Sequence, residues 1–500
     1  MAVEKNNEII GEEVEEEVVE QPEGLPPEVE IEGEEEIEEA PQDDFNANLA
    51  EDMDERTLKS MASTLVDEYK KDKLSRKEWE EAYIKGLDLL GTKYQEVTRP
   101  FKGASGVTHP LLAESVTQFQ AQAYKELVPS DGPVRTQVLG LQTPQTEQQA
   151  ERVKDYMNYL LMEKMEEYST DMDQMLFYLP LSGSTFKKVY YDAMLDRPVA
   201  KFVPSEDLVV PYFASDLKDA ERITHKISMT PNEVVKKQAA GFYRDIELIQ
   251  GSNEPDQLQK KINELEGVKR TEADYLHTIL EMHVDLSLDD FENFDDRAKK
   301  IKIPYIVTLD EGSGEILAIY RNYKPNDETY QRIEYFAHYK FLPGLGFYGF
   351  GLTHMIGGLS RAATQALRQL IDAGTLKNLP AGFKSRGIRV RDDDQPIQPG
   401  EFRDVDAPGG NIKDQFFNLP FTEPSVTLYN LLGFVVQAGQ KFAAITDSNT
   451  GNDAQNRAVG TTIALMERGS RVMSGVHKRC YYAMRLEFKI LARICAQFLP

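Results

Sequence analysis

Seven histidines are the first residues to consider for catalysis or metal binding. They are His109, His225, His277, His283, His338, His354 and His477. None lies in an HExxH sequence or in another spacing typical of metal ligands. His277 and His283 share one face of a predicted strand, but no third ligand is evident. The histidines therefore predict structural or surface roles, and we expect neither a metal site nor a cofactor.

Other reactive residues also lack the partners that catalysis needs. The carboxylates of Asp392, Asp393 and Asp394 are consecutive and point in different directions, whereas a calcium loop needs alternate spacing and a distal glutamate. Cys480 lies on a predicted helix without surroundings that lower a thiol pKa. No Gly-x-Ser-x-Gly elbow occurs. We expect no catalytic residues, which favours a structural role over an enzyme.

Two glycine-rich stretches lack the context of a phosphate site. Residues 99–110 read RPFKGASGVTHP and contain no Gly-Lys-Ser/Thr sequence, so they predict a turn. Residues 346–351 read GFYGFG, but no strand and helix flank them as in a dinucleotide fold. Nucleotide binding is therefore only weakly supported.

The net charge of −27 is concentrated at one end of the 500-residue chain. Residues 1–55 hold 23 acidic side chains and only Lys5 as a base, which leaves about −5 for the rest. We expect 1–55 to form a disordered acidic tail. Neither a signal peptide nor an apolar run of membrane-spanning length occurs, and the two cysteines fit a reducing compartment. The chain is expected to be soluble, without membrane contact.

Residues 56–346 predict an α+β body. Apolar residues recur at helical spacing over 56–91, 110–128 and 145–180, the last with a methionine-rich stripe that suits a core. Short β-branched and aromatic segments follow over 183–230 and 273–345, separated by a polar, partly helical stretch. DEGSG at 310–314 signals a hairpin turn. We expect helices followed by an antiparallel sheet.

Two long apolar helices with a small β module between them are the most unusual feature of the chain. They are predicted over 350–370 and 425–445, and GFKSRGIRV and EFRDVDA read as short strands between them. A polar loop at 447–458 and a helix over 459–498 follow. A compact enzyme seldom places a β module at the end of a helical hairpin.

This order of parts resembles the portal proteins of tailed double-stranded DNA bacteriophages, particularly the short-tailed, P22-like group. The resemblance runs from about residue 60 to the end. It is carried by GFYGFGLTHMIGGLSRAATQALRQLIDAGTLKNLPAGF at 346–383, PGEFRDVDAPGG at 399–410, LPFTEPSVTLYNLL at 419–432 and AVGTTIALMERGSRVMSGVHKR at 458–479.

The resemblance implies a portal-like fold. The body at 56–346 is then the wing, 347–374 and 421–446 are the two stem helices, and 375–420 is the clip. Residues 447–458 take the place of the tunnel loop, and 459–500 form a wing helix that leads toward a crown.

The resemblance also implies a function without enzymatic activity. About twelve copies form a ring at one capsid vertex of the virion, assembled in the host cytoplasm, through which DNA is packaged and ejected. The implied partners are double-stranded DNA without sequence specificity, the terminase packaging motor, tail adaptor proteins, and the major capsid and scaffolding proteins.

Two groups of residues are the candidate sites. Those expected to face DNA, in or beside the tunnel loop, are Lys441, Asp447, Ser448, Asn449, Thr450, Asn452, Asp453, Gln455, Asn456 and Arg457. A polar loop suits sliding contact, because each cation on phosphate adds salt-dependent affinity. Those expected in the clip, for subunit pairing or partner docking, are Lys384, Arg386, Arg389, Arg391, Glu401, Phe402 and Arg403.

Two other functions stay open on the sequence. One is a different structural adaptor that inserts a helical hairpin between partners. The other is an enzyme with an unrecognised site in the sheet region 183–345. A ring would favour the portal, whereas a stable monomer with pocket chemistry would favour the enzyme.

Overall fold

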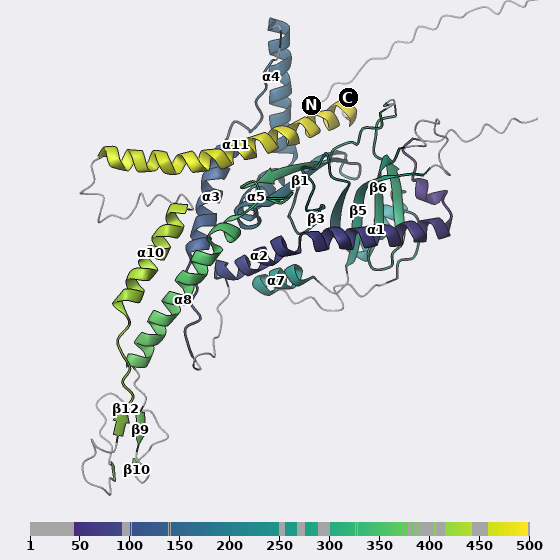
Figure 1. Cartoon of the computed structure of the whole chain (residues 1–500). Coiled ribbons are helices and arrows are strands. Elements are labelled where there is room, and N and C mark those ends of the chain that lie inside the picture. The colour runs from purple at the N-terminus through teal and green to yellow at the C-terminus, as the bar shows by residue number, and fades with distance from the viewer. Residues whose placement is uncertain are drawn as a thin grey trace, which may run out of the picture. The chain divides into compact units, whose positions relative to one another are not determined.

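The computed structural model describes most of the chain after the acidic segment. The described residues are 45–92, 101–249 apart from 102, 139 and 141, 256–267, 276–288, 301–378 apart from 326 and 328, 382–384, 389–390, 405–406, 416–442 and 459–498. Helices and antiparallel sheets make up this part, so the expected α+β class is confirmed (Figure 1).

Two antiparallel sheets form the β part of the body. The first has the order β2-β1-β8 and the second β3-β4-β5-β6-β7. The strands are β1 Ser184–Asp192, β2 Arg197–Val203, β3 Leu208–Val209, β4 Arg222–Met229, β5 His277–Leu286, β6 Ile303–Asp310, β7 Ile316–Arg321 and β8 Phe336–Lys340. The hairpin turn expected at 310–314 joins β6 to β7, with Gly314 at a φ of 71°.

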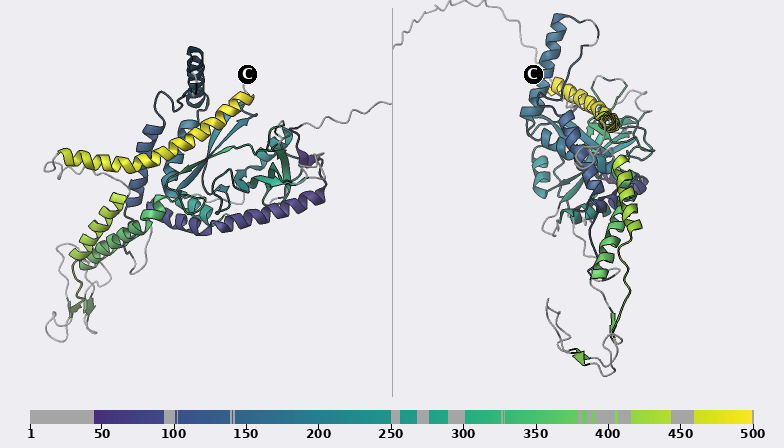
Figure 2. Two further views of the ribbon diagram at one scale, coloured as in Figure 1. Left: turned by 45° about the horizontal axis from the view of Figure 1, so that its top comes forward. Right: turned by 90° about the vertical axis from the view of Figure 1, so that its left-hand side faces the viewer.

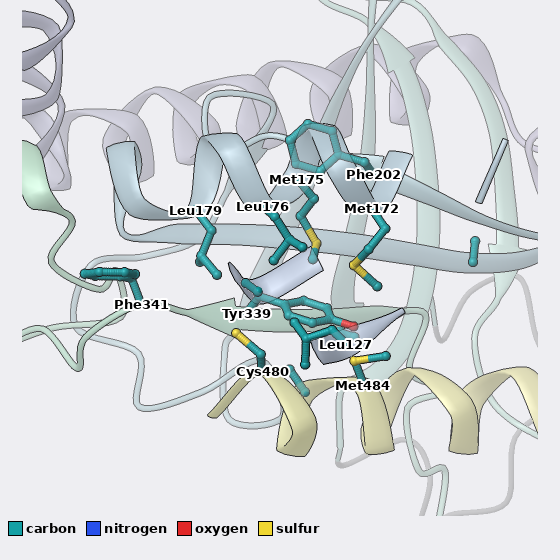
Figure 3. Packing of buried hydrophobic residues seen from close by; sticks show 14 of the residues in the cluster. Leu127, Met172, Met175, Leu176, Leu179, Phe202, Tyr339, Phe341, Cys480 and Met484 are labelled. Carbon is teal, nitrogen blue, oxygen red and sulfur yellow. The ribbon is translucent and has the colours of Figure 1, made fainter. Parts of the chain in front are cut away.

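Helices cover the three-stranded sheet and form the larger core with it. They include α3 Leu111–Leu127, α5 Tyr168–Ser182 and α11 Val459–Phe498. Figure 3 shows Met172, Met175 and Leu176 of α5 in this core together with Tyr339 of β8 and Cys480 of α11. The methionine stripe is therefore core packing, as its helical spacing predicted.

The long helix expected over 145–180 is interrupted. α4 Pro144–Tyr159 runs into a π-helical segment, Leu160–Lys164, and α5 begins only at Tyr168. Leu160, Leu161 and Met165 are nevertheless buried in the larger core. Apolar spacing alone did not reveal the break, because these residues remain buried through it.

Residues 45–53 pack on the five-stranded sheet, although the acidic tail was expected to reach residue 55. Leu49, Ala50 and Met53 are buried against β6 and β7 residues. The Asn48 side chain accepts the Ile319 N–H at 2.9 Å and donates to the Leu317 carbonyl at 3.2 Å. Three apolar side chains among the acids were enough to bury this stretch.

The helix expected over 56–91 is divided by a buried arginine. α1 Glu55–Ser75 and α2 Lys77–Leu87 meet at Arg76, whose side chain is 1% exposed. Its guanidinium donates to the carbonyls of Ser205, Glu206 and Leu208 at 2.7 to 3.1 Å. The helix pair is thereby fixed to the turn before β3.

Glu206, in this turn, gives the fold a pH dependence. Burial, with Asp207 beside it, raises the pKa of the Glu206 carboxyl to about 7, from 4.5. As pH rises, the unfolded chain therefore loses this proton before the folded protein does. Between about pH 4.5 and 7 the free energy of unfolding then falls by about 1.4 kcal/mol for each pH unit because of Glu206. We predict that the free energy of unfolding of Glu206→Gln, relative to that of the unchanged protein, rises by about 2–3 kcal/mol from pH 5 to pH 8.

Thermal unfolding of both proteins across this pH range checks the prediction. The comparison isolates Glu206, because the buried histidines and Asp207 are present in both proteins. A constant difference in stability from pH 5 to pH 8 would contradict it.

The remaining elements form the hairpin and its strands. α8 Leu352–Asn378 and α10 Val426–Phe442 pack against each other, and the views of Figure 2 agree on this. Between them lie β9 Gly382–Lys384, β10 Arg389–Val390, β11 Val405–Asp406 and β12 Phe416–Asn418. Two short helices, α6 Pro231–Ala239 and α7 Gln257–Glu266, complete the body.

Candidate functional site

The root of the hairpin is fixed to the body through α8. The Thr353 hydroxyl donates to the Leu181 carbonyl at 2.6 Å. A Cβ on Gly86 would lie 2.4 Å from Thr353, so α2 and α8 approach closely. The Trp79 indole donates to the Gly349 carbonyl at 3.1 Å and its ring stacks on Tyr348. These contacts give the hairpin a rigid base.

The glycine-rich stretch 346–351 belongs to this base. A Cβ on Gly351 would lie 2.4 Å from the Leu181 carbonyl oxygen, and one on Gly349 2.4 Å from the Gly183 oxygen. The glycines therefore permit close backbone packing, which agrees with the weak support for nucleotide binding.

The stretch that follows Phe101 lies along α8, a contact that the sequence did not reveal. The Asp372 carboxylate accepts the Ser105 N–H at 2.7 Å, and the Arg368 guanidinium donates to the Val107 carbonyl at 2.8 Å. The Thr364 hydroxyl accepts the His109 N–H at 3.1 Å. These polar contacts hold the middle of α8 against the body.

α10 is apolar but largely exposed in the single chain. Phe434 is 69% exposed, and Leu431 and Phe442 are exposed on the same side of the helix. We name these three residues the α10 stripe. Val426 and Tyr429 are exposed on another side. Exposed apolar surface is typical of interaction sites.

The inner side of α10 is the one that the chain itself covers. Leu428, Leu432 and Val435 are partly buried, and α10 packs against α8 and α3. A Cβ on Gly439 would lie 2.5 Å from Leu111 of α3, so this glycine allows a close approach. Gly433, by contrast, is exposed, and a Cβ added to it would have no neighbouring atom within 4 Å.

α8 has an exposed side of a different kind. Met355, Gly358 and Ala362 are exposed and recur at three- and four-residue spacing, so they share one side of the helix. A Cβ on Gly358 would meet no atom of the described structure. The hairpin thus combines large apolar side chains on α10 with a side of α8 on which Gly358 and Ala362 lie among the longer exposed side chains of Met355 and Gln365.

The residues expected to face DNA lie almost entirely outside the described residues. This holds for Asp447, Ser448, Asn449, Thr450, Asn452, Asp453, Gln455, Asn456 and Arg457. Lys441 is described, and its side chain is exposed in the last turn of α10.

The clip residues are described in part. Arg386, Arg391, Glu401, Phe402 and Arg403 lie outside the described residues. Lys384 is in β9 and pairs in register with Phe416 of β12, a strand that the sequence did not reveal. Arg389 of β10 pairs in register with Asp406 of β11. The two expected strand segments are thus present, but the first is divided and its halves pair with different strands.

The body holds buried titratable groups in packed surroundings. The Lys188 ammonium lies 2.6 Å from the Glu281 carboxylate, which also contacts His283 at 3.0 Å. Burial lowers the pKa of His283 and, to about 3, that of His225. Burial raises the pKa of the Cys480 thiol to about 12, so it is unreactive at neutral pH.

Two features are absent from the described residues. No cluster of histidine, cysteine or acidic side chains there has the geometry to hold a metal ion. No helix in that part of the chain combines the length and hydropathy of a membrane span.

No protein-family model matches this sequence, and no match was found among curated proteins.

Proposed function

We propose that this protein is the subunit of a phage portal, a ring at one capsid vertex through which DNA is packaged and ejected. The observation that carries the proposal is the hairpin: a rigid root, the exposed α10 stripe, and an exposed side of α8 at Gly358 and Ala362. The proposal also rests on the sequence resemblance in this region. The protein acts as a conduit and carries no catalytic site of its own.

The two exposed sides of the hairpin differ, which favours a ring over a symmetric dimer. Large side chains of the α10 stripe on one subunit fit the side of α8 at Gly358 and Ala362 on the next. A contact between two different surfaces repeats head to tail, and it closes into a ring when the rotation permits. A dimer about a twofold axis would instead use one patch on both subunits.

The partners that we propose are those that the sequence resemblance implies. Double-stranded DNA passes along the axis without base-specific contact, since phosphate binding alone carries no sequence information. The clip strands β9 to β12 dock the terminase packaging motor and later the tail adaptors. The body contacts the major capsid and scaffolding proteins. These assignments place the protein in the virion after assembly in the host cytoplasm.

Electron microscopy of the purified protein tests the proposal. Negative-stain images are expected to show rings with an axial hole, and mass photometry a mass of about twelve subunits. A monomer at micromolar concentration would reject the portal. A symmetric dimer would favour the second candidate, a structural adaptor that uses the exposed hairpin between two partners.

Deletion of residues 384–406 tests the role assigned to the clip. The strands β10 and β11 are lost, whereas the hairpin root is untouched, so folding of the body is expected to persist. We predict at least a tenfold loss in affinity for the terminase motor, measured by pull-down with purified motor at equal ring concentration. Unchanged ring assembly together with unchanged motor binding would reject the assignment.

A further inference from the structure

A cavity of about 410 Å³ lies where α11 crosses β8. We name it the α11–β8 cavity. α11 contributes Lys478, Arg479, Tyr482 and Leu486, and β8 contributes Phe336, His338 and Lys340. The stretch 216–218 and Glu334 complete its wall. Its volume is within the range of roughly 300–1,000 Å³ that binding sites for small ligands occupy.

Cations in this cavity outnumber the acids, and the acids are already engaged. Glu334 pairs with Lys218 at 3.3 Å, and the Asp216 carboxylate accepts the Lys218 N–H at 2.7 Å. Lys340, Lys478 and Arg479, by contrast, have no carboxylate in ion-pair contact among the described residues. Asp216 attracts the Lys340 ammonium from a longer distance and the Arg479 guanidinium donates to the Phe341 carbonyl at 2.9 Å, but none of these three cations has a carboxylate of the described residues within ion-pair distance.

Lys340 is the half-buried cation of the three. Its ammonium lies 5.5 Å from the centre of the Phe347 ring. Burial lowers the pKa of Lys340, and Asp216 only partly opposes that shift. A half-buried ammonium that retains its proton gains from any anion placed beside it.

The floor of the cavity is apolar. Phe336 is buried, and the His338 ring packs against Phe186 and Phe347 with centroids 4.5 and 4.6 Å away, while those two rings lie 6.0 Å from each other. Burial lowers the pKa of His338 well below its usual value, so the ring is neutral at pH 7. Tyr482 is 64% exposed at the edge, free to cover an apolar guest.

We infer that the α11–β8 cavity binds an acidic peptide segment of a partner protein, with an aliphatic side chain on the floor and flanking carboxylates on Lys340, Lys478 and Arg479. Duplex DNA fits less well, because its phosphates lie on an outer rim and it presents no aliphatic group to an enclosed apolar floor. The inference goes beyond the portal proposal and holds for a monomer as well as for a ring.

Fluorescence anisotropy of the full-length protein with a labelled peptide of alternating glutamate and leucine tests the inference. Lys340→Met, which keeps the side-chain length and removes the charge, is expected to weaken binding about tenfold. Tyr482→Ala is expected to weaken it about threefold through lost apolar cover. Arg485→Gln is the matched control, since Arg485 is exposed on the same helix but lines another cavity.

Three outcomes would overturn the inference. The first is no saturable binding of the peptide to a protein whose circular dichroism spectrum is native. The second is equal loss of affinity in Lys340→Met and Arg485→Gln, which would indicate general charge attraction. The third is a 20-base-pair duplex that binds with the same Lys340 dependence while the peptide does not, which would make the cavity a nucleic-acid site. Weaker binding of a peptide with glutamine in place of glutamate would support the binding of an acidic peptide in the cavity.

Discussion

Phe434→Glu is expected to abolish ring assembly and leave a folded monomer. Phe434 is 69% exposed in the single chain, so a subunit contact would bury most of its ring. Burial of a phenylalanine side chain contributes about 1.5–3 kcal/mol, and a carboxylate in its place adds a desolvation cost. A loss of about 3 kcal/mol corresponds to roughly a hundredfold weaker subunit contact. Because every subunit carries the change, every contact in the ring is weakened.

Mass photometry across a concentration series measures this effect. Met194→Glu is the matched control, because Met194 is an exposed apolar residue in the turn between β1 and β2, away from the hairpin. Ala362→Glu on α8 is expected to act like Phe434→Glu if the two surfaces meet. Rings of Phe434→Glu at the same concentrations as the unchanged protein would reject the hairpin as the subunit contact.

The apolar periodicity predicted the two helices of the hairpin, but it did not predict which of their sides are buried in the single chain. α8 and α10 follow the apolar spacing, and their bounds agree with the expected segments to within a few residues at most ends. Apolar residues occur on several sides of α10, a pattern that a buried helix and a subunit contact share. Only the exposure of Phe434, Leu431 and Phe442 distinguishes the two.

The burial of certain charged side chains could not be predicted from the sequence. Arg76, Lys187 and Glu487 are almost completely buried, although lysine, arginine and glutamate are seldom fully buried in proteins. Their burial depends on partners far away in the sequence, such as the carbonyls of Ser205 and Leu208 for Arg76. Local periodicity carries no information about such partners.

The buried pair formed by Lys187 of β1 and Glu487 of α11 joins the last helix to the first sheet. Both side chains are 0% exposed, and the ammonium lies 3.6 Å from one carboxylate oxygen. The Tyr339 hydroxyl donates to the other oxygen. The ammonium also lies 3.7 Å from the centre of the Tyr168 ring. The pair therefore ties α11, β1, β8 and α5 together at one point.

Glu487→Ala is expected to destabilise the protein by about 3–5 kcal/mol, because it leaves the Lys187 ammonium buried without its anion. Burial already lowers the pKa of Lys187, and Glu487 is the first group that opposes that shift. Lys187→Met alone is expected to be destabilising too, since it leaves the carboxylate unpaired. Urea unfolding followed by circular dichroism measures both variants.

The double variant Lys187→Met with Glu487→Leu separates a missing charge partner from lost packing. Well-packed apolar residues in place of a buried ion pair are often neutral for stability, but the Tyr339 hydroxyl loses its acceptor, so the double variant is expected to lose only about 1–3 kcal/mol. With Glu487→Leu as the matching single variant, the coupling energy in the double-mutant cycle would then exceed about 3 kcal/mol. If the two single losses simply add, the charges of Lys187 and Glu487 do not couple α11 to β1. A large coupling instead makes this pair the main polar attachment of α11, the helix that also forms one wall of the α11–β8 cavity.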